Sequence, residues 1–316
     1  MSRYIVRRLL LVIPTLFIVS LIVFSLIRMI PGDVAVLMVE NYRYADDIPM
    51  LRQKLGLDKP LHEQYLSWVG NMLRGDFGES LWTRRSIVEE LWNRIPVSLE
   101  LGILTIIISL LIALPIGIYS ALRQDTKTDY VARSFAIAGL SIPGFWLATM
   151  IVVFPAIWFR WSPPLQYVPF SKDPLANLWQ FAIPSLILGV ERSASVMRMI
   201  RAMMLEVLRQ DYIRTAWSKG LQEMVIVYRH ALKNAMIPVI TIIGLQIPFI
   251  MGGSVIMESI FALPGMGRFM IEVISQRDYP MLQAVNIVFA TLVVFTNLLV
   301  DITYAYLDPR IRLRQR

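Results

Sequence analysis

Long apolar runs alternate with polar segments along this chain. A helix that crosses a membrane needs about 20 predominantly apolar residues. Runs of about that length cover residues 9–27, 99–122, 131–159, 236–257 and 282–307. The pattern therefore predicts an all-α protein that crosses a membrane several times.

A further apolar run, residues 181–200, is weaker because it contains Glu191 and Arg192. Charged side chains within a membrane are costly and usually face a polar interior. Two interpretations stay open. Either the helix continues out of the membrane, so that both charges are structural and lie near the surface, or the charges line a central cavity. With this run included, the sequence predicts six transmembrane helices.

Residues 1–30 are predicted to form a first transmembrane helix that is retained. A secretory signal peptide has an apolar core of roughly 7–15 residues and a small-residue cleavage site. The run here is longer, and no Ala-x-Ala site follows it. The preceding Arg3, Arg7 and Arg8 place the N-terminus in the cytoplasm.

Residues 31–97 are polar and separate the first two predicted helices. Segments such as Pro31-Gly32-Asp33 and Gly75-Asp76-Phe77-Gly78 favour turns. Apolar residues recur at helical spacing at Leu61, Tyr65, Trp68, Val69 and Met72. We expect a small extracytoplasmic subdomain of short helices. It is either an inert cap or a surface that meets a substrate-delivering protein.

Composition supports a membrane protein and excludes some kinds of site. Of the 316 residues, 56% are hydrophobic and 17% charged, and the mean hydropathy is +0.57. The net charge of +8 arises from basic residues beside apolar runs, so membrane lipid and not nucleic acid is the expected contact. There is no cysteine, and the only histidines are His62 and His230, so no metal site is expected.

Basic residues concentrate in the short segments predicted to face the cytoplasm. They are Arg123, Lys127 and Arg133 and the arginines of the tail, residues 308–316. Both termini are therefore expected in the cytoplasm, in a multi-pass protein of the cell's inner (cytoplasmic) membrane. The same topology places residues 206–238 in the cytoplasm.

The longest predicted cytoplasmic loop, residues 206–238, is basic and amphipathic. It is long enough for two short helices with a turn at Gly220. One interpretation is a segment that rests on anionic lipid headgroups. The other is a protein-docking element, because Ala216 and Gly220, at i and i+4, would share one helix face and leave a small-residue notch.

This loop resembles the EAA loop of permease subunits of ABC importers, in the form found in the dipeptide/oligopeptide/nickel subfamily. The similarity lies in Tyr212-Ile213-Arg214-Thr215-Ala216, Lys219-Gly220-Leu221, Arg229-His230-Ala231-Leu232 and Ile237-Pro238. Arg214-Thr215-Ala216 stands where the general motif has Glu-Ala-Ala. The resemblance continues in KLGLDKPL and RIPVSLEL and through residues 98–307, the expected five-helix permease core.

The resemblance implies a cytoplasmic coupling helix between the fourth and fifth transmembrane helices, seated in a groove of an ATP-hydrolysing subunit. It implies as partners a second homologous permease subunit, two ATP-binding subunits and an extracytoplasmic substrate-binding protein. ATP and Mg²⁺ would be bound by the partner subunits, with no cofactor in this chain. The residues expected at the ATPase contact are Asp211, Tyr212, Arg214, Thr215, Ala216, Lys219, Gly220, Leu221, Arg229 and His230.

Other residues are candidates for the transport pathway or its gate. The segment Glu258–Arg268 resembles the F-x-x-P-G-x-G stretch near the outer mouth of peptide permeases, and its Pro264, Gly265 and Gly267 should break helix geometry at membrane level. The candidates are Pro143, Phe145, Trp146, Glu191, Arg192, Phe261, Pro264, Met266 and Asp301.

The sequence contains no P-loop motif G-x-x-x-x-G-K-(S/T), and no H-E-x-x-H or G-x-S-x-G motif. Uphill transport would therefore take its energy from a partner or an ion gradient. The leading hypothesis is a non-enzymatic permease subunit for di- or oligopeptides, with nickel chelate or glutathione as alternative substrates. A secondary transporter that uses Glu191, Arg192 and Asp301 as a relay, and a receptor-like membrane protein, are the other hypotheses.

Overall fold

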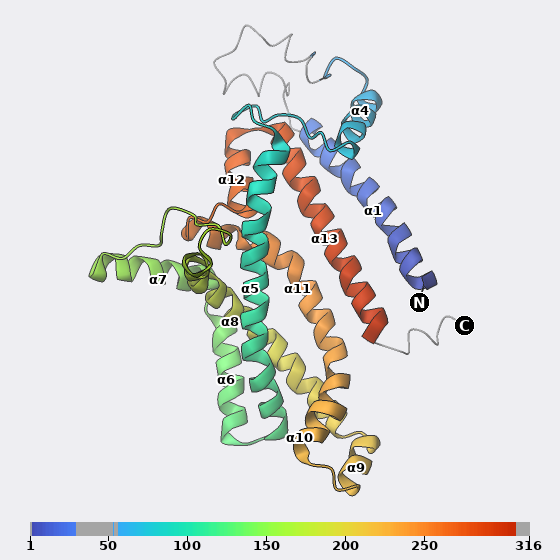
Figure 1. The fold of residues 1–316 in the computed structure, drawn as a ribbon, viewed down its shortest axis with the longest axis vertical. Helices are drawn as coiled ribbons and strands as arrows, with labels where there is room; N and C mark the ends of the chain where they lie inside the picture. Colours follow the sequence, from blue (N-terminus) through green and yellow to red (C-terminus); the bar gives the residue numbers. More distant parts are fainter. Residues whose placement is uncertain (1, 30–52, 54–55, 308–316) are drawn as a thin grey trace. The chain divides into compact units, whose positions relative to one another are not determined.

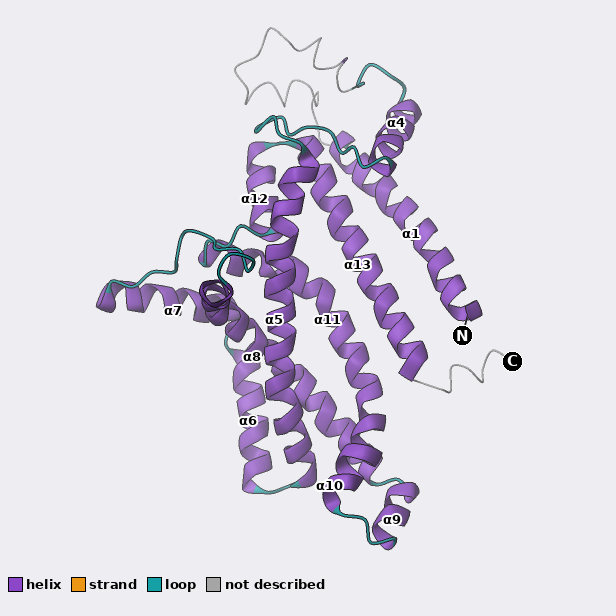
Figure 2. Cartoon of the chain, in the orientation of Figure 1, coloured by secondary structure: helices purple, strands orange, loops and turns teal. Residues whose placement is uncertain are grey.

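The computed structural model describes residues 2–29, 53 and 56–307, and its regular elements there are helices (Figure 2). The α-helices are labelled in Figure 1. The bounds are α1 Ser2–Arg28, α4 Leu61–Leu73, α5 Ile87–Leu122, α6 Lys127–Ser141, α7 Gly144–Phe159, α8 Pro174–Leu208, α9 Asp211–Ser218, α10 Glu223–Val225, η2 Ile226–Ala231, α11 Leu232–Ile260, α12 Met266–Gln276 and α13 Tyr279–Leu307. The prediction of an all-α protein is confirmed. Pro31-Gly32-Asp33 and the tail 308–316 lie outside the described residues.

Four helical stretches in the described residues are long and apolar enough to cross a membrane. They are Ile5–Leu26, Ile87–Leu122, Glu223–Ile247 and Tyr279–Thr303. Helices α6 and α7 provide a fifth if the pair counts as one span. α8 has 35 residues but carries Glu191 and Arg192, and it is not among these stretches. A multi-pass fold is confirmed, whereas the number six stays a prediction.

Residues 131–159, predicted as one span, do not form one continuous helix. The chain forms two helices there, α6 and α7, bent by 81°. Proline disfavours the helical conformation of the residue before it. Accordingly Ile142 is extended (φ −94°, ψ 118°) and ends α6, while Pro143 stands at the N-cap of α7. The signal for this break was present in the sequence.

The chain divides into two compact units. One unit comprises Ser2–Ser98 and Pro264–Leu298. In it, α1 packs on α4 through rings of Phe24, Tyr65 and Trp68, and the Tyr65 hydroxyl lies 2.7 Å from Ser20 Oγ. The helical spacing noted over residues 61–72 corresponds to α4.

A small apolar core in the same unit joins the start of α5 to α12 and α13. It includes Ile87, Leu91 and Phe269. α5 begins at Ile87, within the segment predicted as an extracytoplasmic subdomain. The predicted break at Gly267 is wrong, because α12 begins at Met266 and Gly267 is buried inside it.

The other unit comprises Leu99–Leu263 and Leu299–Arg316, and α8 is its central helix. α8 packs against α6, α7 and α11. Its approach to α5 is close at two glycines. A Cβ added at Gly117 would lie 2.9 Å from Ile200 Cγ2, and one at Gly189 would lie 2.6 Å from Ile108 Cγ2. Only glycine allows the two backbones to approach so closely.

Candidate functional site

The loop predicted over residues 206–238 is built around one short helix, α9, and one left-handed glycine. Gly220 has φ +73°. Its N–H donates to the Trp217 carbonyl (2.9 Å) and the Leu221 N–H to the Ala216 carbonyl (3.4 Å). This pair of bonds is the Schellman motif, in which glycine follows the helix C-cap. The predicted turn at Gly220 is confirmed.

The second short helix expected after Gly220 is not a separate element. α10, the π-helical segment η2 and α11 follow one another without interruption from Glu223 to Ile260. The predicted notch shared by Ala216 and Gly220 on one helix face is also wrong. α9 ends at Ser218, so Gly220 lies beyond it, and Ala216 is buried in the apolar core.

α9 has one buried face and one exposed face. Ile213 and Ala216, at i and i+3, are buried and join a core that includes Met204 of α8 and Ile226 of η2. The exposed side carries polar and aromatic groups. They include Asp211, Tyr212, Arg214, Thr215, Trp217 and Lys219, and the turn adds Leu221. One face of α9 thus packs against the core of its own chain, and the other face is exposed.

A hydrogen bond fastens α9 to the start of α11. The Asn234 side-chain N–H donates to the Tyr212 hydroxyl (2.8 Å) and to the His230 carbonyl (3.1 Å). In η2, Arg229 is exposed and His230 half-buried. The predicted contact residues therefore lie on α9, its turn and η2, and Ala216 is the one among them that is buried.

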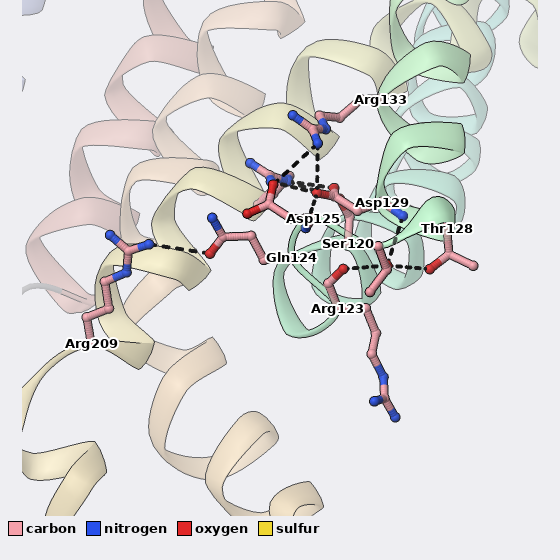
Figure 3. Close-up of polar contacts among 10 residues, drawn as sticks. Ser120, Arg123, Gln124, Asp125, Thr128, Asp129, Arg133 and Arg209 are labelled. Atoms are coloured by element: carbon pink, nitrogen blue, oxygen red, sulfur yellow. Dashed lines mark hydrogen bonds and ion pairs between the residues drawn. The ribbon is translucent and has the colours of Figure 1, made fainter.

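Sequence reasoning missed a buried charge cluster at the turn between α5 and α6 (Figure 3). Asp129, in the first turn of α6, is fully buried. Arg201 of α8 donates from Nε and Nη2 to its two carboxylate oxygens, each at 2.9 Å. The Ser120 hydroxyl and the Asp125 backbone N–H also donate to it, and Arg133 Nη2 lies 3.1 Å away.

The signal for this cluster was weak. Asp129 is an acidic residue between Lys127 and Arg133, which the charge pattern had assigned only to membrane orientation. Its main partner lies 72 residues further along the chain. The hydrogen bonds to Asp129 also hold the pKa of Arg201 above its ordinary value, so this pair stays ionised.

Among the pathway candidates, the structure brings Glu191 to the break between α6 and α7. A Cβ added at Gly144 would overlap the Glu191 carboxylate. A carboxylate beside a helix N-terminus is electrostatically favoured, and Gly144 is the first residue of α7. Pro143, Phe145 and Trp146 are exposed at the same break. The neighbouring Arg192 is half-buried, and its Nε has no hydrogen-bond partner.

The remaining pathway candidates lie elsewhere. Phe261 caps the C-terminus of α11 and is buried, and Asp301 is half-buried in α13. Pro264 and Met266 belong to the other compact unit. There Met266 is fully buried, and its N–H donates to Ser98 Oγ (2.8 Å). Within the described residues, no group of three or more His, Cys, Asp or Glu side chains could hold a metal ion.

Comparison with known proteins assigns this chain to a family. Residues 113–313 match the family described as "Binding-protein-dependent transport system inner membrane component". Residues 1–102 match its N-terminal counterpart, "Binding-prot-dependent transport system membrane comp, N-term".

Curated relatives match along nearly the whole chain. The glutathione transport system permease protein GsiC of Escherichia coli (strain K12) is 38% identical over 313 residues, covering 99% of both chains. The oligopeptide transport system permease protein AppB of Bacillus subtilis (strain 168) is 38% identical over 314 residues, covering 98% of this chain and 99% of its own.

Solved structures show the same fold at low identity. A chain of the MetNI methionine ABC transporter, in inward-facing conformations, has a TM-score of 0.54 at 17% identity, covering 69% of this chain and 96% of its own. An amino acid ABC transporter solved with histidines has a TM-score of 0.52 at 15% identity, with coverages of 69% and 94%. The chain therefore belongs to the family of binding-protein-dependent transport system inner membrane components, the permease subunits of ABC importers.

Proposed function

We propose that this chain lines the translocation pathway of an importer for di- or oligopeptides, driven by ATP hydrolysis in separate subunits. The observation that carries the proposal is the 38% identity to AppB, an oligopeptide permease, over 98% of the chain. The similarity to GsiC supports glutathione as the alternative substrate. Glutathione is itself a tripeptide, so both relatives favour a short peptide.

We assign the coupling role to α9. Its buried Ile213 and Ala216 fix it to the permease, while its exposed Tyr212, Arg214 and Trp217 are free to enter a groove of an ATPase subunit. A ligand shifts a conformational equilibrium only through different contacts in the two states. The exposed face of α9 must therefore bind the ATP-bound and nucleotide-free ATPase dimers differently.

The proposed assembly has this chain paired with a second, homologous permease, above two ATPase subunits and below a substrate-binding protein. ATP and Mg²⁺ bind to the ATPase subunits, and this chain has neither a cofactor nor an ATPase site of its own. Both termini and α9 face the cytoplasm, in accordance with the basic residues of the short inner segments.

A secondary transporter driven by an ion gradient is the remaining hypothesis, and the family membership of the chain opposes it. The observation in its favour is the half-buried Glu191 of α8, which lies against Gly144 at the helix break. Intramembrane carboxylates form proton relays in such transporters. The two candidates differ in the energy source that they require.

The test is reconstitution of the whole complex, with its permease, ATPase and binding-protein partners, in proteoliposomes. We expect uptake of a labelled dipeptide, oligopeptide or glutathione only with ATP and the loaded binding protein. An ATPase subunit with its P-loop lysine replaced should abolish uptake. Uptake by this chain alone under a proton gradient, without nucleotide, would contradict the proposal.

A further inference from the structure

The Asp129 cluster joins two consecutive helices, α5 and α6, to the sequence-distant helix α8. Asp129 belongs to α6, Ser120 to α5 and Arg201 to α8. We propose that Asp129 is a positioning residue of the coupling step: it fastens the α5–α6 turn to α8, so that α5, α6 and α8 follow α9 as one body. The proposal rests on the coupling role of α9 proposed above.

Burying the charge of Asp129 has a cost in free energy. Asp129 is fully buried, and a buried carboxylate persists only when it is paired and hydrogen-bonded. Arg201 binds it with both Nε and Nη2, which fixes orientation as well as distance. Such a pair adds little net stability over apolar packing, and we infer that here it specifies one arrangement of the groups around it.

α5 and α8 have no room to slide at their contact. The Ile200 side chain of α8 packs against the α5 backbone at Gly117, and the Ile108 side chain of α5 packs against the α8 backbone at Gly189. A Cβ at Gly117 would also lie 3.0 Å from the Met197 carbonyl oxygen, and one at Gly189 3.3 Å from that of Thr105. Close-packed helices transmit displacement and do not absorb it.

At one end of α8, the Asp129 cluster is connected to α9. The guanidinium of Arg209, which caps α8 directly before α9, donates to Gln124 Oε1 of the α5–α6 turn (3.3 Å). The apolar core runs without interruption from α5 through Met204 to Ile213 of α9. A displacement of α9 therefore reaches both α8 and the α5–α6 turn.

Towards the middle of α8, Glu191 connects the same helix to the break between α6 and α7. Glu191 lies on the same helix as Arg201 and contacts the α6–α7 break at Gly144. If α6 and α8 move together, the break moves with them. This provides a mechanical connection from α9 to the gate candidates Pro143, Phe145 and Trp146.

The first experiment measures substrate molecules taken up per ATP hydrolysed in the reconstituted complex. We expect Asp129→Asn and Arg201→Leu to lower this ratio about tenfold, within the usual range of coupling free energies. Arg201→Lys, which keeps the charge, should restore part of it. Glu272→Gln, which removes an acid from the half-exposed pair with Arg268 on α12, should leave the ratio unchanged.

The ratio separates positioning from a merely structural role, because loss of assembled complex lowers uptake and hydrolysis together. An Asp129→Asn complex that assembles and keeps the wild-type ratio would overturn the proposal. Absence of ATP-dependent uptake in the wild-type complex would instead overturn the proposed function.

A second experiment decides the matter if the Asp129 variants do not assemble. The Cβ of Ala194 on α8 lies 4.0 Å from a Cβ built at Gly139 on α6, within the range of a disulfide. The chain has no cysteine of its own. We expect a Gly139→Cys, Ala194→Cys complex to keep its uptake when oxidised, since the two helices move together. Loss of uptake on oxidation that reduction reverses, absent from the single-cysteine controls, would show that α6 and α8 move apart.

Discussion

Gly144, the first residue of α7 after the helix break, lies against the carboxylate of Glu191 in α8. Its missing side chain leaves the space that the Glu191 carboxylate occupies. The atom in conflict with a Cβ is the far end of a flexible side chain, so an alanine here would displace Glu191 and leave the backbone in place. The position therefore allows Glu191 to be moved without removing its charge.

We expect Gly144→Ala to lower substrate uptake by about tenfold, since small displacements at a working site have large effects on rate. The free energy of unfolding should change by less than about 1 kcal/mol. Uptake in proteoliposomes and the thermal unfolding midpoint are the measurements. Gly139→Ala is the matched control, because its Cβ would meet nothing closer than 3.8 Å. Equal uptake by both variants would show that the position of Glu191 is unimportant.

At the scale of elements, α9 combines two roles on opposite faces. The buried face, Ile213 and Ala216, belongs to the permease core, and the exposed face carries Tyr212, Trp217 and Lys219. The helix has only 8 residues and would not be stable alone in water. Its stability comes from the core beneath it and from the Schellman turn at Gly220.

Substitutions on the two faces of α9 should therefore differ in kind. Ile213→Ala leaves a cavity in the core and should destabilise the permease by about 2–5 kcal/mol, seen as a lower unfolding midpoint of the purified subunit. Trp217→Ala, on the exposed face, should change that midpoint little. It should weaken the retention of the ATPase subunits when the complex is purified. A Trp217→Ala complex that retains its ATPase subunits as the wild type does would count against the exposed face as the docking surface.

At the scale of the whole molecule, the proposed topology places α9 on the cytoplasmic side of the membrane. Because the chain contains no cysteine, single introduced cysteines report their own side. Lys219 follows α9, and Arg74 follows α4 in the segment predicted to be extracytoplasmic; both are exposed.

We expect an impermeant maleimide to label Arg74→Cys in intact cells and Lys219→Cys only in inside-out vesicles. The physical reason is the excess of Lys and Arg in the short segments assigned to the cytoplasm. Mass spectrometry of the labelled chain gives the result. Labelling of Lys219→Cys from outside the cell would reverse the topology and remove α9 from reach of an ATPase.

The sequence alone determined that the chain is helical and apolar, where its main apolar runs lie, and that a basic loop with a turn at Gly220 follows α8. These properties depend on hydropathy and on local backbone preferences, which the order of residues contains. The break at Pro143 was also local and could have been predicted. The family resemblance was equally present in the loop and in the flanking motifs.

Only the tertiary structure decided which residues meet. Arg201 meets Ser120 and Asp129 because α8 packs against α5 and α6. Its separations of 81 and 72 residues from them leave no periodic signal. Ala216 was expected to face a partner and instead packs inward, because the core beneath α9 is assembled from several helices. Glu191 likewise takes its place against Gly144 only once α7 turns away from α6. Contacts of this kind depend on the packing of whole helices, which local sequence patterns do not specify.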